Sequence, residues 1–140
     1  MDGYKRIEHC IGRYIAEHYC SPVEIGVGNN FTAAECIVSG GIGVRCTDIN
    51  PREPPKGVCF ISDNIFSPRE GHYSGADLLY SVRPAEEMVP PMKDLARSLN
   101  CDLLVYHLGF ESYGNGGDLI ECGVILHRYH TRKDLNSEKG

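Results

Sequence analysis

The sequence predicts an α/β protein, with one three-layered domain built around a mainly parallel sheet whose last strand is antiparallel. Short apolar segments of strand length alternate with helices or loops along the chain, an order typical of parallel sheets. The 140 residues, 41% hydrophobic and 24% charged, fit a single soluble domain with a substantial core. The last apolar segment follows a tight glycine-rich turn, which predicts that it runs antiparallel to the strand before it.

The N-terminal residues 3–20 predict an amphipathic helix that packs on this domain. Ile7, Ile11 and Ile15 recur at helical spacing, with charged residues elsewhere on the helical wheel. The helix is expected to end before Pro22, because the residue that precedes a proline disfavours helical geometry.

Six strands are predicted from the apolar segments, at residues 22–28, 43–49, 57–62, 76–82, 102–108 and 119–129. Two further helices are expected between them. One spans residues 32–39 and is stopped by the glycine pair that follows it. The other lies within residues 86–100. Its first turn can begin as late as Pro90 or Pro91, because proline suits the first turn of a helix.

The remaining segments are predicted to be connections. The link 50–57 contains three prolines and is too short for an ordinary crossover helix. The glycine-rich turn 109–118 leads to the last strand, and residues 114–117 within it are interpreted as a hairpin turn and not as a phosphate loop, because no helix follows them. Residues 130–140 are polar and are expected to form a disordered tail, so the folded domain is predicted to span residues 1–129.

Charge and cysteine content argue against several classes of protein. The net charge of −5 disfavours generic binding to nucleic acid, which needs a basic face. No apolar run approaches the roughly 20 residues that span a bilayer, and the N-terminus lacks the apolar core of a signal peptide. The seven cysteines have no C-x-x-C spacing, which predicts reduced thiols in a cytoplasmic protein without a zinc site. His127 and His130 lack a nearby third ligand, so no metal is expected there either.

The segment from Glu24 to Phe31 predicts a strand end, a glycine turn and a helix N-terminus, the arrangement on which nucleotide ligands bind. Gly26 and Gly28 allow a ligand to approach the backbone where a Cβ would block it. The dinucleotide fingerprint has a third glycine where this chain has Phe31, because that glycine lets the helix pack closely on the strand. Phe31 would push the helix away, so a standard NAD site is disfavoured.

Three acids occupy successive predicted strand ends. Glu24 lies at the first, Asp48 at the second and Asp63 at the third. In a parallel sheet these ends share one edge, where ligands bind, and an acid about 20 residues after the glycine turn accepts hydrogen bonds from ribose hydroxyls. Each acid also has a simpler interpretation, with Glu24 as a helix cap and the two aspartates as turn-forming residues.

Two further features remain open to more than one interpretation. Arg83, at the end of the fourth predicted strand, can bind a carboxylate or phosphate, or can pair on the surface with Glu86 or Glu87. The loop from Ile65 to Tyr73 can be a lid over the site or a solvated connection.

The order VEIGVGNN, TDIN, SDNI and ADLLYSVRP resembles motifs I to IV of the class I S-adenosylmethionine-dependent methyltransferases. The resemblance implies a truncated Rossmann-like fold and a cofactor site. In that site the backbone near Gly26 and Gly28 faces the methionine moiety, Asp48 holds the ribose, Ile49 packs on the adenine, and Asp63 meets the adenine amine. The cofactor-binding residues implied in this way are Glu24, Gly26, Gly28, Asn30, Asp48, Ile49 and Asp63.

The whole chain, including the stretch YSVRPAEE, is similar to a small archaeal family of uncharacterised proteins with a Rossmann-like, methyltransferase-like fold. It departs from the methyltransferase pattern at Asn30, which replaces the third glycine of motif I. It also departs at residues 81–84, which contain no catalytic tetrad, and it has little chain left for a substrate domain.

The favoured function is therefore binding of S-adenosylmethionine or a related adenosine-containing ligand, with methyl transfer to an unknown acceptor as the activity that such binding would support. A polyphosphate ligand is disfavoured, because three clustered acids repel it. The alternative is a non-catalytic Rossmann-like module that binds no cofactor and serves as a subunit or adaptor for a protein partner.

Overall fold

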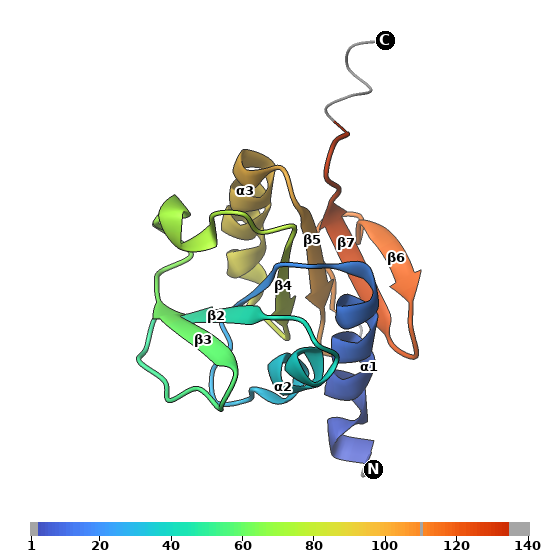
Figure 1. The fold of residues 1–140 in the computed structure, drawn as a ribbon. Helices are drawn as coiled ribbons and strands as arrows, with labels where there is room; N and C mark the ends of the chain where they lie inside the picture. The colour runs from blue at the N-terminus through green and yellow to red at the C-terminus, as the bar shows by residue number, and fades with distance from the viewer. Residues whose placement is uncertain (1–2, 110, 135–140) are drawn as a thin grey trace.

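One sheet organises the molecule. The computed structural model describes residues 3–109 and 111–134. Within these residues the sheet has seven strands in the order β3-β2-β1-β4-β5-β7-β6 (Figure 1). The strands are β1 (Pro22–Ile25), β2 (Val44–Asp48), β3 (Val58–Ser62), β4 (Leu78–Val82), β5 (Asp102–Tyr106), β6 (Asp118–Glu121) and β7 (Ile125–His130).

The strand directions confirm the mainly parallel sheet. Strands β1 to β5 all run parallel to one another. Strand β7 is antiparallel to both β5 and β6, as predicted for the last strand, and β6 therefore runs in the same direction as β1 to β5. The single predicted strand at 119–129 was wrong, because residues 122–124 turn the chain and divide it into β6 and β7.

The interpretation of residues 114–117, within the stretch 109–118, as a hairpin turn was also wrong. This segment connects β5 to β6, but β7 lies between those two strands in the sheet. The hairpin of this region is instead β6–β7. Strand β7 continues to His130, which the sequence had assigned to the tail. Residues 131–134 have no regular structure, and the rest of the predicted tail lies outside the described residues.

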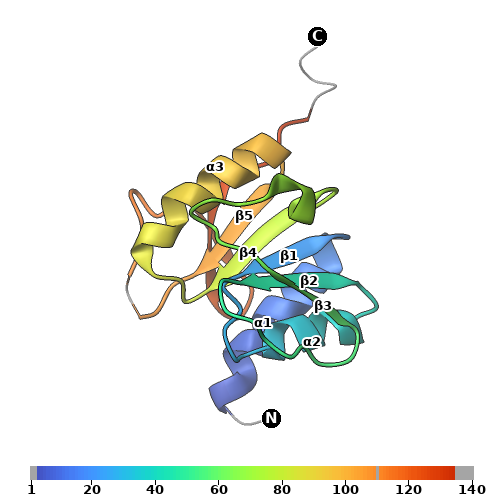
Figure 2. The same cartoon turned by 90° about the vertical axis from the view of Figure 1, so that its left-hand side faces the viewer.

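Helices cover both faces of the sheet (Figures 1 and 2), which confirms the three-layered α/β architecture. The helices α1 (Gly3–His18) and α2 (Thr32–Ser39) lie on one face, and α3 (Val89–Leu99) lies on the other. Helix α3 has prolines in its first turn, as predicted. Two 3-10 helices complete the fold: η1 (Glu70–Tyr73) lies in the connection from β3 to β4, and η2 (Glu86–Met88) directly precedes α3.

Glycines let α1 lie close against α2. A Cβ on Gly12 of α1 would lie 2.6 Å from the Cβ of Cys36, and a Cβ on Gly40 would lie 2.8 Å from that of Ala16. Larger residues at these two positions would therefore force the helices apart. The close packing fixes α1 over the sheet and carries the Glu8 side chain into the interior.

The order of the strands determines where a ligand pocket can form. From β1 the chain continues to β2 and β3 on one side, and it then returns to form β4 and β5 on the other side. The segments that leave β1 and β4 therefore diverge at the carboxyl edge of the sheet. Open α/β sheets bind their ligands at such a switch point.

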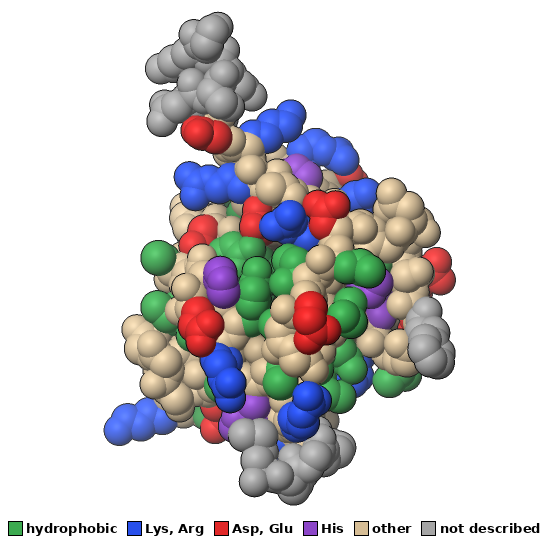
Figure 3. All heavy atoms as spheres, turned by 90° about the vertical axis from the view of Figure 1, so that its right-hand side faces the viewer, with side chains coloured by type: hydrophobic (Ala, Val, Ile, Leu, Met, Phe, Trp, Pro, Cys, Tyr) green, Lys and Arg blue, Asp and Glu red, His purple; other side chains and the backbone are tan. Residues whose placement is uncertain are grey.

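The surface shows three further features. None of the helices in the described ranges has the length and apolar character needed to cross a membrane. All seven cysteines are free thiols. Figure 3 shows the flank that carries α1 and β6, where hydrophobic side chains gather near the middle among charged ones. Leu119 of β6 and Ile125 of β7 are among the exposed large hydrophobic residues.

Candidate functional site

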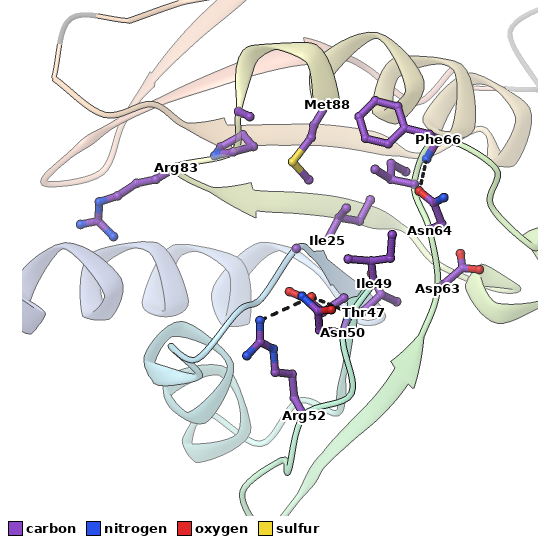
Figure 4. Close-up of a pocket in the computed structure, with 15 residues that line it drawn as sticks. Ile25, Thr47, Ile49, Asn50, Arg52, Asp63, Asn64, Phe66, Arg83 and Met88 are labelled. Atoms are coloured by element: carbon purple, nitrogen blue, oxygen red, sulfur yellow. Dashed lines mark hydrogen bonds and ion pairs between the residues drawn. The ribbon is translucent and has the colours of Figure 1, made fainter.

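A pocket of about 360 Å³ opens at the switch point of the sheet. Its walls come from the ends of β1 and β2, the loop after β3, and the segment from the end of β4 to η2 (Figure 4). We call it the large pocket. Four of the residues implied to bind a cofactor line it, namely Gly26, Asp48, Ile49 and Asp63.

The glycine turn after β1 is fixed by its backbone conformation. Gly26 and Gly28 have φ values of 71° and 60°, a region that residues with a Cβ rarely adopt. The N–H of Gly26 donates to the carbonyl of Thr47 at 2.9 Å. A Cβ on Gly26 would lie 3.0 Å from Cε of Met88, whose side chain points into the large pocket (Figure 4). Gly26 therefore keeps one wall of the pocket open.

Asp48 ties the end of β2 to this turn. One carboxylate oxygen, Oδ2, accepts the N–H of Gly28 at 2.8 Å, and Oδ1 accepts the N–H of Asn50 at 2.9 Å. Arg52 lies 3.7 Å from Oδ1 and donates to the Asn29 side chain at 2.7 Å. A carboxylate has about four lone-pair sites, so Asp48 keeps capacity for a diol while it also forms the turn.

Asp63 anchors the loop that follows β3. Its Oδ2 accepts the hydroxyl of the fully buried Tyr73 at 2.7 Å, and its carboxylate faces the N–H of Arg69 at 3.4 Å. Ile65 and Phe66, at the start of this loop, line the large pocket. Phe66 is 58% exposed, so the loop combines a fixed base with an apolar side chain at the pocket.

Glu24 and Asn30 do not line the large pocket. They line a smaller space of about 90 Å³, the small cavity, which lies between the glycine turn, the end of β4 and α1. The Asn30 side chain also accepts the N–H of Thr32, the first residue of α2, at 3.1 Å. The predicted set of ligand residues is thus divided between two neighbouring spaces, while Gly28 supports Asp48 through its backbone.

The Glu24 carboxyl group is buried, and its Oε1 atom has no hydrogen-bond partner. Burial raises the pKa of Glu24 to about 8. The nearby Glu8 carboxylate acts in the same direction, and the Tyr80 hydroxyl acts in the opposite direction. The side chain lies on the face covered by α1 and α2, away from Val23 and Ile25, which pack on the α3 face.

Arg83 stands between the two spaces and lines both of them. Its Nη2 atom lies 2.9 Å from Oε1 of Glu8, and Figure 4 shows its side chain reaching toward α1. Its guanidinium also lies 5.3 Å from the centre of the Tyr106 ring. Arg83 has a φ of 55°, a strained value for a residue with a side chain. Neither predicted surface partner, Glu86 or Glu87, is the partner seen here.

Sequence reasoning missed Glu8, Phe66 and Met88 as site residues. A signal for Glu8 existed, because it occupies the same helical face as Ile11 and Ile15, three and seven positions before them. A charged residue on a buried helical face is unusual and points to a buried partner. Phe66 lies in an irregular loop and Met88 ends the short 3-10 helix η2, and no spacing rule places their side chains.

A model of the uncharacterised protein family UPF0146 matches residues 8–115 of this chain. The chain belongs to this family. A UPF0146 protein of Pyrococcus horikoshii is 38% identical over 112 residues, which cover 76% of this chain and 86% of the relative. A UPF0146 protein of Archaeoglobus fulgidus is 32% identical over 119 residues, with 84% and 86% coverage. The relatives are archaeal, as the sequence resemblance implied.

Solved structures similar to this UPF0146 chain are methyltransferases. The putative methyltransferase yhhF of Escherichia coli superposes with a TM-score of 0.55 at 8% identity, over 88% of this chain and 82% of that one. S-adenosylmethionine-bound CalS10 of Micromonospora echinaspora has a TM-score of 0.54 at 15% identity, over 81% and 58%. The methyltransferase CcbJ of Streptomyces caelestis superposes with a TM-score of 0.53 at 13% identity, over 70% of this chain and 47% of that one. The chain spans only about half of CcbJ and CalS10, and the likeness confirms the methyltransferase-like fold.

Proposed function

We propose that the large pocket binds S-adenosylmethionine or its demethylated product, S-adenosylhomocysteine. The observation that carries the proposal is the position of Asp48. It ends β2 beside the glycine turn, at the switch point of the sheet, and it is oriented by two backbone N–H groups with acceptor capacity left over. A ribose diol requires an acceptor of this kind.

The rest of the large pocket suits the other parts of such a ligand. Ile49 and Phe66 are exposed apolar side chains that line it, and they offer surfaces for an adenine ring. Asp63 keeps acceptor capacity beyond its bond from Tyr73, which suits an adenine amine. Gly26 leaves the backbone open near the methionine moiety.

S-adenosylmethionine supplies a methyl group on a positively charged sulfur, which is already an activated leaving group. The chain therefore needs mainly to position an acceptor and to exclude water, and an acid–base pair is not essential. Ser81, at the end of β4, is committed to the backbone, because its hydroxyl donates to the carbonyl of Ile25 at 2.7 Å. Methyl transfer is the activity that we propose for this pocket.

The test is a titration of ¹⁵N-labelled protein with S-adenosylhomocysteine, followed by amide shifts and by calorimetry. Saturable shifts at Gly26, Ile49 and Asp63 are expected, while ATP, whose phosphates the acids repel, is expected to bind more weakly. The absence of saturable shifts with both S-adenosylmethionine and S-adenosylhomocysteine would contradict the proposal. It would favour the alternative, a Rossmann-like module that binds a protein partner without a cofactor.

A further inference from the structure

The small cavity contains an acid with one oxygen atom that lacks a partner. Glu24 is only 2% exposed, and its Oε1 atom is buried, lines the cavity and accepts no hydrogen bond. Buried polar atoms are nearly always satisfied, and an orphaned one costs free energy that a bound donor would recover. The cavity, about 90 Å³ in volume, has room for a group of a few heavy atoms.

The charges around the cavity point to a cationic occupant. Glu8 and Arg83 form an ion pair at 2.9 Å, so their charges compensate each other. The ionised form of Glu24 then carries the one uncompensated charge among the residues that line the cavity. An occupant with a single positive charge would balance it.

The size and lining of the cavity favour a primary ammonium group. An ammonium is compact and carries three donors, whereas Ca²⁺ needs six to eight oxygen ligands. The acceptors that line the cavity are few, and the remaining walls are the apolar side chains of Val27, Ala33 and Val82. These walls suit the first carbons of an alkylamine.

We propose that the small cavity binds the primary ammonium group of a second small substrate, the methyl acceptor. This inference rests on the proposed function of the large pocket. Arg83 belongs to the walls of both spaces, so an amine held beside Glu24 lies next to the ligand of the large pocket. The protein would then act on small amines.

The chemistry is balanced without a further reactant. An ammonium nitrogen has no lone pair, so one of its protons first passes to the Glu24 carboxylate. The lone pair of the resulting amine forms the new C–N bond while the C–S bond of the methyl sulfonium breaks. The electron pair of that bond remains on sulfur, and a thioether and a protonated N-methylamine result.

Occupation of the cavity by a cation should depend on pH. Burial raises the pKa of Glu24 to about 8, so in the empty cavity the group is mostly protonated at neutral pH. Binding of the cation requires the carboxylate, and affinity should therefore rise as the pH passes through about 8 and then level off, while an alkylammonium stays charged. The other charged or titratable groups that face Glu24 are Glu8 on α1, Tyr80 on β4, Arg83 directly after β4, and Cys46 on β2.

The probe is methylammonium, titrated into the labelled protein and followed by amide shifts. Saturable shifts are expected at Val27, Asn30 and Val82, with an affinity that increases between about pH 7 and pH 9. Glu24→Gln keeps the shape of the side chain and is expected to weaken this binding about tenfold or more. Glu35→Gln, on the exposed side of α2, is the matched control and should change nothing.

S-adenosylhomocysteine affinity is measured on the same variants. Glu24→Gln is expected to change it by less than about twofold. If the variant loses S-adenosylhomocysteine together with methylammonium, the ammonium subsite belongs to the ligand of the large pocket and the inference is overturned.

Two outcomes in the wild-type protein separate this inference from the proposed function. Methylammonium that produces no saturable, pH-dependent shifts overturns the ammonium site, even if S-adenosylhomocysteine binds. If methylammonium binds but S-adenosylhomocysteine does not, the proposed function is overturned, and the acceptor role is overturned with it. Both measurements use wild-type protein and so do not depend on the folding of a variant.

Discussion

The acids of the large pocket and of the small cavity, both at the carboxyl edge of the sheet, differ in their hydrogen bonding. In the large pocket, Asp48 accepts two backbone N–H groups and Asp63 accepts the Tyr73 hydroxyl. In the small cavity, Glu24 is buried and one of its oxygens has no partner. The difference teaches that acids at adjacent strand ends need not form one site, even when their sequence spacing suggests it.

The contrast has a consequence for mechanism. Hydrogen bonds to a carboxylate favour its charged form and hold it in one orientation, whereas burial without donors penalises the charge. Asp48 is therefore arranged to position a neutral group such as a diol. Glu24 is arranged to lose its proton when a bound cation or a higher pH stabilises the carboxylate.

The largest expected effect concerns the pH dependence of stability. Glu24 has its pKa raised from 4.5 to about 8, so between these values the folded protein holds a proton that the unfolded chain releases. The free energy of unfolding should fall as pH rises across this window, by up to roughly 1.4 kcal/mol per pH unit from this group. Glu24→Gln removes that term and should be the more stable protein above pH 8.

Urea unfolding at a series of pH values measures the effect. Glu35→Gln provides the reference, because this residue is exposed on α2. The two curves should separate progressively with rising pH. If Glu24→Gln and Glu35→Gln show the same slope as the wild type, Glu24 is ionised in the folded protein at neutral pH, and the contrast between the two spaces disappears.

The second effect tests the partition between the two spaces. Arg83→Ala leaves the carboxylate of Glu8, whose side chain is 3% exposed, without its counter-ion. Removing one partner of a buried ion pair costs about 3–5 kcal/mol, and the lower end is expected because 31% of the Arg83 side chain is exposed. Restoring neutrality with Glu8→Gln in the Arg83→Ala background should recover much of the loss.

Denaturant unfolding of the two single variants and the double variant completes this cycle. A sum of the single effects equal to the double effect would mean that the pair does not couple α1 to the end of β4. In that event the ion pair would not fix the position of Arg83 beside the large pocket and the small cavity.

A third, smaller effect concerns Asp48, the acid whose two oxygens both accept hydrogen bonds. Asp48→Ala frees the N–H groups of Gly28 and Asn50 and should lower the free energy of unfolding by about 1.5–3 kcal/mol. It should also weaken S-adenosylhomocysteine binding. Asp48→Asn retains one acceptor oxygen and should lose less stability. Calorimetry and urea unfolding on both variants separate the two roles, and unchanged ligand affinity in a folded Asp48→Ala protein would remove Asp48 from the ribose site.

The sequence predicted β1 to β5 well because each is a short apolar run bounded by strong breakers. The segment 119–129 lacked such a boundary, since apolar residues stand on both sides of the turn and a single glycine is the one breaker between them. Gly123, with a φ of 95°, is the signal that was overlooked, because a lone glycine inside a strand pattern often marks a break.

The site was predictable where local spacing fixes it. Gly26, Asp48, Ile49 and Asp63 follow parallel strands directly, so they had to meet at one edge. Successive side chains of a strand point to opposite faces of the sheet. In the four-residue strand β1, Glu24 therefore points away from the face on which Val23 and Ile25 pack. The pairing of Glu8 with Arg83 depends on how α1 packs, which no local pattern specifies.

The smallest effect is expected at Arg52, which lies beside both the glycine turn and Asp48. Its Nη2 lies 3.7 Å from Asp48, too long for a hydrogen bond, and its other contact is the side chain of Asn29. Arg52→Gln should therefore change the free energy of unfolding by less than about 1 kcal/mol, as should the surface-pair control Arg97→Gln.

Ligand affinity makes Arg52 informative despite its small effect on stability. If the ribose binds Asp48 in the large pocket, the guanidinium competes for Oδ1, and Arg52→Gln should bind S-adenosylhomocysteine as tightly as the wild type or a few-fold more tightly. A loss of about tenfold or more, measured by calorimetry, would instead mean that Arg52 contacts the ligand directly. The large pocket would then depend on a positive charge as well as on its satisfied acids, and its contrast with the small cavity would rest on hydrogen bonding alone.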